Sequence, residues 1–291
     1  MGLIRTRLLC GILFVSPMSG VIGYCPASFG SAFSYDRCLA ETQDFECFRH
    51  DVATKFDFLS DKSVVVVIGA YKGENVELIA SNSRPNFVLF EPIREFSQIL
   101  RQKFSQYPNR VDVYDTAVGI ANKTAFIGLD SDASSVVAEG EGDSIAIRVS
   151  TFDTYYADII RRYGKIDLLY VNCEGCEYEV LTDILKHGWQ EKIDRLLLQF
   201  HYQSDGYSKA RCPLLHILSA THHREFSYPW VWEMWVRQSE PNRGLLPTVY
   251  WVIDAVSNNV STGTIVITAV VILGVLALTR KRKAKPRRRS R

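Results

Sequence analysis

Acidic residues are missing from both ends of the chain. No Asp or Glu stands before Asp36 or after Asp254, whereas these two ends carry two arginines and nine Lys or Arg, respectively. Removing those eleven from the 34 basic residues leaves 23 against 32 acids, so the body has a charge of about −9 although the whole chain is +2. An acidic body excludes binding to the phosphate backbone of nucleic acid as its main function.

The sequence also lacks the ligand sets of structural zinc. It has one C-x-x-C, Cys173–Cys176, with no second C-x-x-C and no H-x-x-x-H, so we expect no metal, and a redox role is the alternative for this pair. Seven cysteines are present; leaving Cys10 aside, six remain, which is compatible with disulfides. Cys38 and Cys47 flank a short segment and are the first pair we would test for a bridge.

Long apolar runs occur near both ends. Arg5 and Arg7 followed by Leu8–Val15 predict a signal peptide over 1–23, with N-myristoylation as a weaker alternative. The uncharged stretch 262–279 predicts a transmembrane helix, and the basic tail 280–291 would face the cytosol. We therefore expect a single-pass type I membrane protein of the secretory pathway or cell surface. If Leu8–Val15 is not a signal, the body would instead face the cytosol and the tail would bind anionic lipid.

The body is organised around Ser63–Glu77. Val64–Ile68 predicts a strand that is buried on both faces, and Gly69 and Gly73 then bracket a turn before a helix over Glu74–Ala80. A second strand, Asn86–Glu91, ends in an acid about 20 residues after the first glycine. In doubly wound folds this pattern is typical of a nucleotide-like cofactor, whose ribose the acid binds.

The rest of the body alternates strands and helices. We expect a helical segment over 24–60 and one domain over 61–257, an α/β, Rossmann-like doubly wound, mostly parallel sheet with an antiparallel C-terminal edge. Further strands are expected at Arg110–Tyr114, Ile145–Ser150, Lys165–Asn172 and Asp194–His201, and a hairpin over Ala117–Leu129. Helices are expected over Ile93–Tyr107, Phe152–Tyr163, Glu177–His187 and Lys209–Ala220. Two aromatic-rich strands, near Phe226–Arg237 and Thr248–Asp254, close the domain; the aromatics of the first pack on a helix or, alternatively, stack a sugar.

Four short motifs give a family resemblance. The segments IGAYKG, FEP at Phe90–Pro92, STFDTYY at Ser150–Tyr156 and DLLYVNCEGCEYEVL at Asp167–Leu181 occur in the order found in the FkbM family of S-adenosylmethionine-dependent methyltransferases, which this chain resembles from about Val64 to Val236. The resemblance implies a class I methyltransferase fold and methyl transfer to a hydroxyl of a glycan or small metabolite.

The resemblance also assigns roles by position. Gly69, Ala70 and Gly73 would lie along the cofactor, Glu91 would hold its ribose, and Asp115 would lie near its adenine. Asn172, Glu174 and Glu177 would face the reacting methyl group. The family usually has acids where this chain has Val67 and Asn172, so a catalytically inactive binding or scaffold protein is the alternative.

Methyl transfer to a hydroxyl also needs a group that removes the proton. His201, at the end of the fifth strand of the parallel sheet, is our first candidate because imidazole titrates near neutral pH. Glu174 is the second candidate. The expected partners are S-adenosylmethionine and a glycan or small hydroxylated substrate, with the membrane through 262–279 and no nucleic acid.

Overall fold

The computed structural model describes residues 34, 38, 56–128, 136–137, 144–201, 205–228 and 230–240. The predicted signal peptide, transmembrane helix, basic tail and strand Thr248–Asp254 lie outside these residues, as does most of the segment 24–60.

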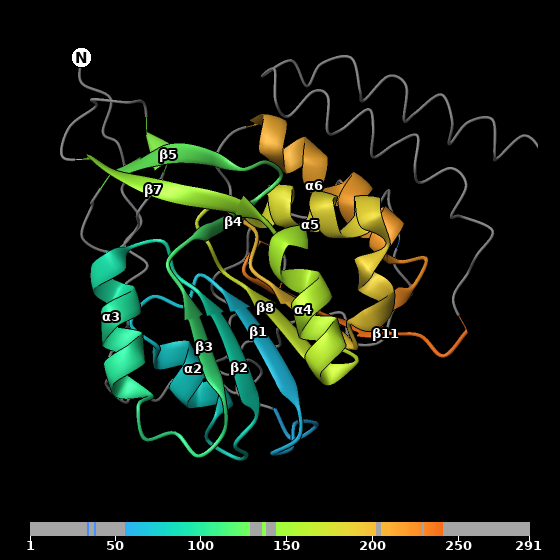
Figure 1. The fold of residues 1–291 in the computed structure, drawn as a ribbon. Helices are drawn as coiled ribbons and strands as arrows, with labels where there is room; N and C mark the ends of the chain where they lie inside the picture. The colour runs from blue at the N-terminus through green and yellow to red at the C-terminus, as the bar shows by residue number, and fades with distance from the viewer. Residues whose placement is uncertain are drawn as a thin grey trace, which may run out of the picture.

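A seven-stranded sheet forms the centre of the body (Figure 1), in the order β10-β11-β9-β8-β1-β2-β3. β1 lies in the middle and pairs in parallel with β2 and β8, and all five of its residues are at most 2% exposed. Burial on both faces explains why this strand is a continuous apolar run. The strands are β1 (Val64–Ile68), β2 (Asn86–Phe90), β3 (Val111–Tyr114), β8 (Leu168–Val171), β9 (Arg195–Leu198), β10 (His222–Tyr228) and β11 (Trp232–Arg237).

Helices cover both faces of this sheet. Alternate residues of β1 point to two separate cores: Val66 packs with residues of α4, α5 and α6, and Val65 packs with residues of α2 and α3. This is the layering of a doubly wound α/β fold, as predicted. The helices are α2 (Glu74–Ile79), α3 (Arg94–Lys103), α4 (Asp153–Tyr163), α5 (Glu177–His187), the 3-10 helix η1 (Trp189–Lys192) and α6 (Asp205–Leu218).

The C-terminal edge differs from the prediction in two ways. The segment predicted as one strand, Phe226–Arg237, belongs to the hairpin β10–β11, whose turn is closed by a hydrogen bond from the Val231 N–H to the Tyr228 carbonyl. β11 is antiparallel to β9 and lies one place in from the edge, so the edge strand is β10. Trp232 and Trp235 are buried in the two cores, so packing rather than sugar stacking explains them.

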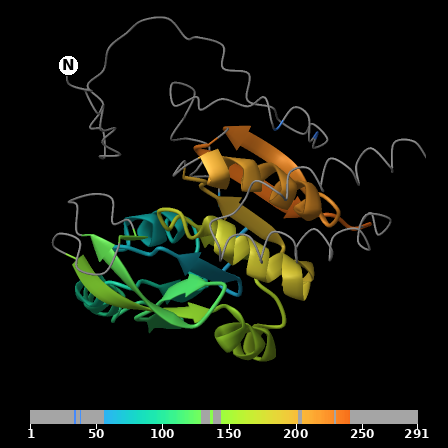
Figure 2. The ribbon, with the colours of Figure 1, turned by 90° about the horizontal axis from the view of Figure 1, so that it is seen from above.

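A second sheet interrupts the alternation after β3. It contains β4 (Ala117–Gly119), β5 (Lys123–Gly128), β6 (Val136–Val137) and β7 (Ser144–Thr151), in the order β4-β7-β5-β6. The predicted hairpin over Ala117–Leu129 is therefore wrong, because β7 lies between the two segments and pairs with β4 in parallel and with β5 in antiparallel. In Figure 2 this sheet and the β10–β11 hairpin lie on opposite sides of the molecule.

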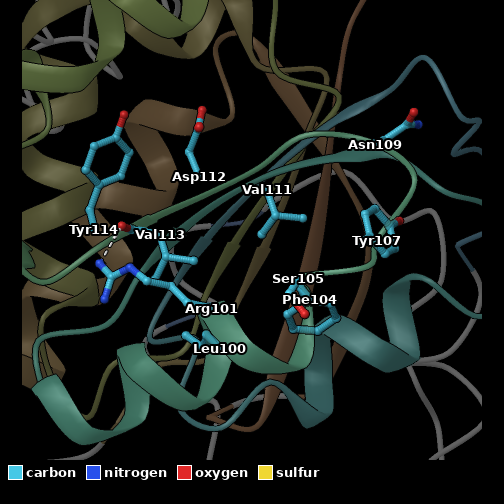
Figure 3. Close-up of a pocket in the computed structure, with 10 residues that line it drawn as sticks. All are labelled: Leu100, Arg101, Phe104, Ser105, Tyr107, Asn109, Val111, Asp112, Val113 and Tyr114. Atoms are coloured by element: carbon cyan, nitrogen blue, oxygen red, sulfur yellow. Dashed lines mark hydrogen bonds between the residues drawn. The ribbon is translucent and has the colours of Figure 1, made fainter.

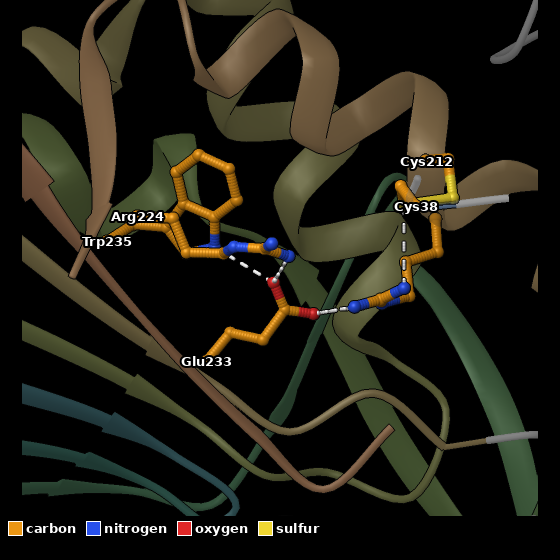
Figure 4. Close-up of a disulfide and its surroundings, with 6 residues drawn as sticks. Cys38, Cys212, Arg224, Glu233 and Trp235 are labelled. Atoms are coloured by element: carbon orange, nitrogen blue, oxygen red, sulfur yellow. Dashed lines mark hydrogen bonds and ion pairs between the residues drawn. A yellow bond between two sulfur atoms is a disulfide. The ribbon is translucent and has the colours of Figure 1, made fainter. Parts of the chain in front are cut away.

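A disulfide and a buried ion pair join α6 to distant parts of the chain. Cys38 is bonded to Cys212 of α6, with a Cα–Cα distance of 5.8 Å, so the suggested pairing of Cys38 with Cys47 is wrong. Spacing along the chain does not reveal which segment folds next to Cys38. The Arg211 guanidinium of α6 contacts the Glu233 carboxylate of β11, and both side chains are at most 1% exposed. Figure 4 shows Glu233 with its neighbours Arg224 and Trp235 and the Cys38–Cys212 bond.

The structure contradicts the predicted single-pass membrane localisation. None of the helices in the described ranges combines the length and the apolar character that crossing a bilayer requires. This finding contradicts the single-pass type I assignment, and the ranges 1–23 and 262–279 on which that assignment depended lie outside the described residues.

Candidate active site

The carboxyl ends of the parallel strands meet at one edge of the main sheet. The turn Gly69–Gly73 follows β1, Glu91 follows β2, Asn172 follows β8, and His201 lies three residues after β9. In doubly wound folds ligands bind at this edge. The topology therefore brings most of the predicted site residues to the same side of the sheet.

The two glycines of the turn are explained by packing within the protein. Gly69 and Gly73 have φ angles of +83° and +91°, which other residues rarely adopt. A Cβ on Gly69 would lie 1.8 Å from the Asn172 carbonyl oxygen, and one on Gly73 would lie 2.9 Å from Leu100. The positions where side chains would extend are thus filled by protein, so packing alone accounts for both glycines, and their role along the cofactor stays a prediction. Ala70 is buried, and its N–H donates to the Phe90 carbonyl.

Glu91 fastens this turn to the end of β2. Its Oε2 accepts the Tyr71 N–H at 2.8 Å and its Oε1 accepts the Ile93 N–H at 2.9 Å, and the residue is 4% exposed. Burial raises the pKa of Glu91 to about 7, although both N–H groups oppose the shift. The sequence pattern did not predict that Glu91 would accept a hydrogen bond from the Tyr71 N–H. Each carboxylate oxygen can accept a second hydrogen bond, so the two observed bonds leave acceptor sites for ribose hydroxyls. The ribose role of Glu91 stays a prediction.

Asp115 contacts Arg101 rather than another predicted site residue. Its carboxylate pairs with Arg101 of α3 at 2.5 Å. Partial burial raises the pKa of Asp115, but hydrogen bonding and the charge of Arg101 outweigh burial and lower this pKa. Beside this pair, a cavity of about 440 Å³ lies between α3 and the edge strand β3 (Figure 3). None of the predicted site residues lines that cavity, so its position gives no support to the adenine role of Asp115.

The three predicted catalytic residues do meet. His201 Nδ1 lies 2.6 Å from Glu177 Oε1, and His201 Nε2 lies 3.3 Å from Glu174 Oε1. Glu177 begins α5 and is fully buried, whereas the Glu174 side chain is 37% exposed. We call these three residues the carboxylate–histidine cluster. It joins the loop after β8 to the end of β9.

The loop after β8 has an unusual backbone. Glu174 and Gly175 have φ angles of +54° and +114°, and the disulfide Cys173–Cys176 closes around them. The Cys173 N–H also donates to Glu177 Oε1 at 3.2 Å. A left-handed glutamate is uncommon and marks a constrained position. The C-x-x-C spacing predicted a redox pair as one alternative, but not that the pair would surround a residue of the cluster.

The cluster changes the protonation of His201. Burial of the ring disfavours its charged form, but Glu174 and Glu177 together outweigh burial and raise the pKa of His201 to about 10. A ring that already holds its proton at neutral pH cannot accept another. This arrangement therefore argues against the general-base role predicted for His201, and Glu174 is the carboxylate of the cluster that solvent reaches.

This pKa gives a testable dependence of stability on pH. The pKa is about 6.5 in an unfolded chain and about 10 in the folded protein. Because the folded state holds the proton more tightly, the stabilisation is complete below about pH 6.5 and is lost as the pH rises through about 10. Denaturant unfolding should show that His201→Gln destabilises the protein more at pH 6 than at pH 10.5. An equal loss at both values would contradict the pairing.

Two buried acceptors at this edge have no hydrogen-bond partner within the described part of the chain. They are Asn172 Oδ1 and Glu177 Oε2. Unpaired buried acceptors are costly, and a donor or a cation from a ligand would satisfy them. Both atoms are acceptors, so a ligand that satisfies them has to supply donors or positive charge. Among the described residues no His, Cys, Asp or Glu group is arranged to hold a metal ion.

Solved structures of similar architecture include several methyltransferases. One is a 23S rRNA methyltransferase, ErmE (12% identity, TM-score 0.38, covering 77% of this chain and 82% of that one). Another is M. capricolum TrmK with S-adenosyl-homocysteine (10%, 0.37, covering 74% and 86%). A third is the Podospora anserina methyltransferase PaMTH1 with S-adenosyl-homocysteine (10%, 0.38, covering 70% and 86%). Scores at this level support no inference about function, and curated protein sequences gave no match.

A family model gives the decisive comparison. The methyltransferase FkbM domain matches residues 68–226, more than half of the chain. The match extends from the end of β1 to β10 and includes Glu91, the loop after β8 and His201. The chain therefore belongs to the methyltransferase FkbM family, a family of S-adenosylmethionine-dependent methyltransferases.

Proposed function

We propose that this protein transfers a methyl group from S-adenosylmethionine to a hydroxyl oxygen of a glycan or a small hydroxylated metabolite. The observation that carries the proposal is the carboxylate–histidine cluster at the carboxyl edge of the sheet, with His201 2.6 Å from Glu177 and 3.3 Å from Glu174. When bound, S-adenosylmethionine supplies a methyl group on a positively charged sulfur.

The acceptors at this edge would hold the cofactor. Asn172 Oδ1 and Glu177 Oε2 are buried and lack partners among the described residues, so they suit the donors of an ammonium group. The cluster carries two carboxylates and one imidazolium, which leaves a net negative charge beside a positive ligand. Glu91 fixes the turn after β1 through Tyr71, and its remaining lone pairs would accept ribose hydroxyls.

Glu174 would take the proton of the acceptor hydroxyl. It is the exposed carboxylate of the cluster, and its constrained backbone limits where its oxygens lie. Glu177 is fully buried and instead keeps His201 charged and oriented. As the oxygen gains the methyl group, its proton moves to Glu174, and His201 holds this carboxylate in place.

The test uses a methyl-labelled cofactor. The full chain is incubated with deuteromethyl S-adenosylmethionine and with sets of glycans and small polyols, and the products are analysed by mass spectrometry. The proposal predicts a deuteromethyl ether on oxygen. Label found only on nitrogen or carbon acceptors would overturn the proposed reaction, as would the absence of transfer to every acceptor by a folded protein that binds the cofactor.

A further inference from the structure

The Cys173–Cys176 disulfide adds little to the stability of the fold. In the chain-entropy description, a disulfide stabilises a protein more when it closes a longer loop. Cys173 and Cys176 are three residues apart, whereas Cys38 and Cys212 are 174 apart. The long-range bond therefore constrains the unfolded chain much more. A short ring placed at the end of β8 needs another explanation.

The position of this ring supplies one. The two residues inside it are Glu174 and Gly175, both in the left-handed region, and Glu174 Oε1 lies 3.3 Å from His201 Nε2. The Cys173 N–H, directly before the ring, donates to Glu177. The disulfide thus closes the backbone that carries Glu174, and the residues it joins flank the contact to Glu177. Breaking the bond would free the backbone of Glu174 to leave the left-handed region.

Neither cysteine is fully buried, although both pack against the core on the α5 side of the sheet. Cys173 and Cys176 are each half-buried, and Cys176 is the residue that caps the 11-residue helix α5 at its N-terminus. The C-x-x-C spacing at the start of a helix favours thiol–disulfide exchange, because the helix end stabilises a thiolate. The cluster's own carboxylates oppose that charge and would favour the oxidised form when no reductant is present.

We propose that Cys173 and Cys176 are a reversible thiol–disulfide site that takes a dithiol as its reductant, and that the oxidised form holds Glu174 against His201. On reduction, the Sγ–Sγ bond breaks, two electrons and two protons pass to the two cysteines, and the dithiol is left as a cyclic disulfide. Reoxidation by a disulfide of the same class restores the ring. The expected loss of methyl transfer on reduction rests on the proposed function. The expected loss of the contact between Glu174 and His201 does not depend on it.

The experiment follows His201 and the thiols together. The full chain is equilibrated in mixtures of reduced and oxidised dithiothreitol, alkylated thiols are located by peptide mass spectrometry, and the His201 titration is followed by NMR. We expect the His201 pKa to fall from about 10 toward its ordinary value as Cys173 and Cys176 become alkylatable. Methyl transfer should fall about 10- to 100-fold, the cost of misplacing a reacting group by about 1 Å.

Two variants serve as controls. In Cys173→Ser/Cys176→Ser the His201 pKa should already lie below that of the oxidised parent and should not respond to dithiothreitol. The same is expected for Glu174→Gln, which keeps both cysteines; the contact with Glu177 remains in both variants. An unchanged His201 pKa on reduction of this bond would overturn the proposal, and so would cysteines that remain thiols under oxidised dithiothreitol. A response of His201 without any methyl transfer would refute the proposed function alone.

Discussion

Glu233→Gln is expected to destabilise the folded protein by about 3–5 kcal/mol, the cost of breaking a buried ion pair by removing one of its members. Glu233 is 1% exposed and accepts a hydrogen bond from the Arg211 Nε at 2.9 Å, and its Oε2 lies 3.2 Å from the Trp235 indole nitrogen, which donates to it. Arg224, also buried, lies 4.0 Å from the same carboxylate. Glutamine keeps the shape but removes the negative charge that both arginines contact.

The matched control for this change is Glu225→Gln on the neighbouring strand β10. Glu225 pairs with Arg195 at 2.7 Å, but its side chain is 47% exposed. An exposed ion pair contributes at most about 1 kcal/mol. Both variants are compared with the parent by denaturant unfolding. Similar losses of unfolding free energy in the two variants would show that Glu233 is not an essential counter-charge.

Glu174→Gln is expected to slow methyl transfer by about 10²- to 10⁴-fold, the range attributed to general acid–base catalysis. Glutamine matches the size of glutamate but cannot accept a proton at neutral pH. The side chain is partly exposed, and the disulfide ring is unchanged in this variant. The folded structure should therefore survive, and the effect should appear in kcat.

The control for Glu174 is Glu191→Gln, which changes an exposed carboxylate of η1. The labelled-methyl assay described above measures both variants under saturating cofactor. Glu191→Gln should transfer methyl at the parent rate. If Glu174→Gln also stays within about twofold of the parent, Glu174 is not the base, and the chemistry of the cluster would need another account.

The main sheet was predictable because strands that are buried on both faces have continuous apolar sequences. Val64–Ile68 is apolar without interruption since both faces of β1 are covered, and α5 has the predicted bounds, Glu177–His187. The second sheet was not predictable in the same way. Ala117–Gly119 and Lys123–Gly128 are close in sequence, but each pairs with β7, and a local pattern does not reveal a partner sixteen or more residues away.

The candidate site shows the same limit. The alternation of strands and helices predicted that Glu174, Glu177 and His201 follow the carboxyl ends of neighbouring parallel strands. This was sufficient to predict that the three side chains lie close to one another. Their protonation depended on the distances between them, because two carboxylates around one imidazole reverse the effect of burial. Likewise the sequence did not show that the missing side chain of Gly69 makes room for the Asn172 carbonyl.

The most direct test of the site is the binding of S-adenosylmethionine to the full chain, measured by titration calorimetry with the parent and with Asn172→Ala. The parent should bind at saturation with one molecule per chain. The variant should bind about tenfold more weakly, because a hydrogen bond to a charged donor contributes about 1.5 kcal/mol or more. Absence of binding by the folded parent, or equal affinity in both proteins, would contradict the assignment of this edge of the sheet as the cofactor site.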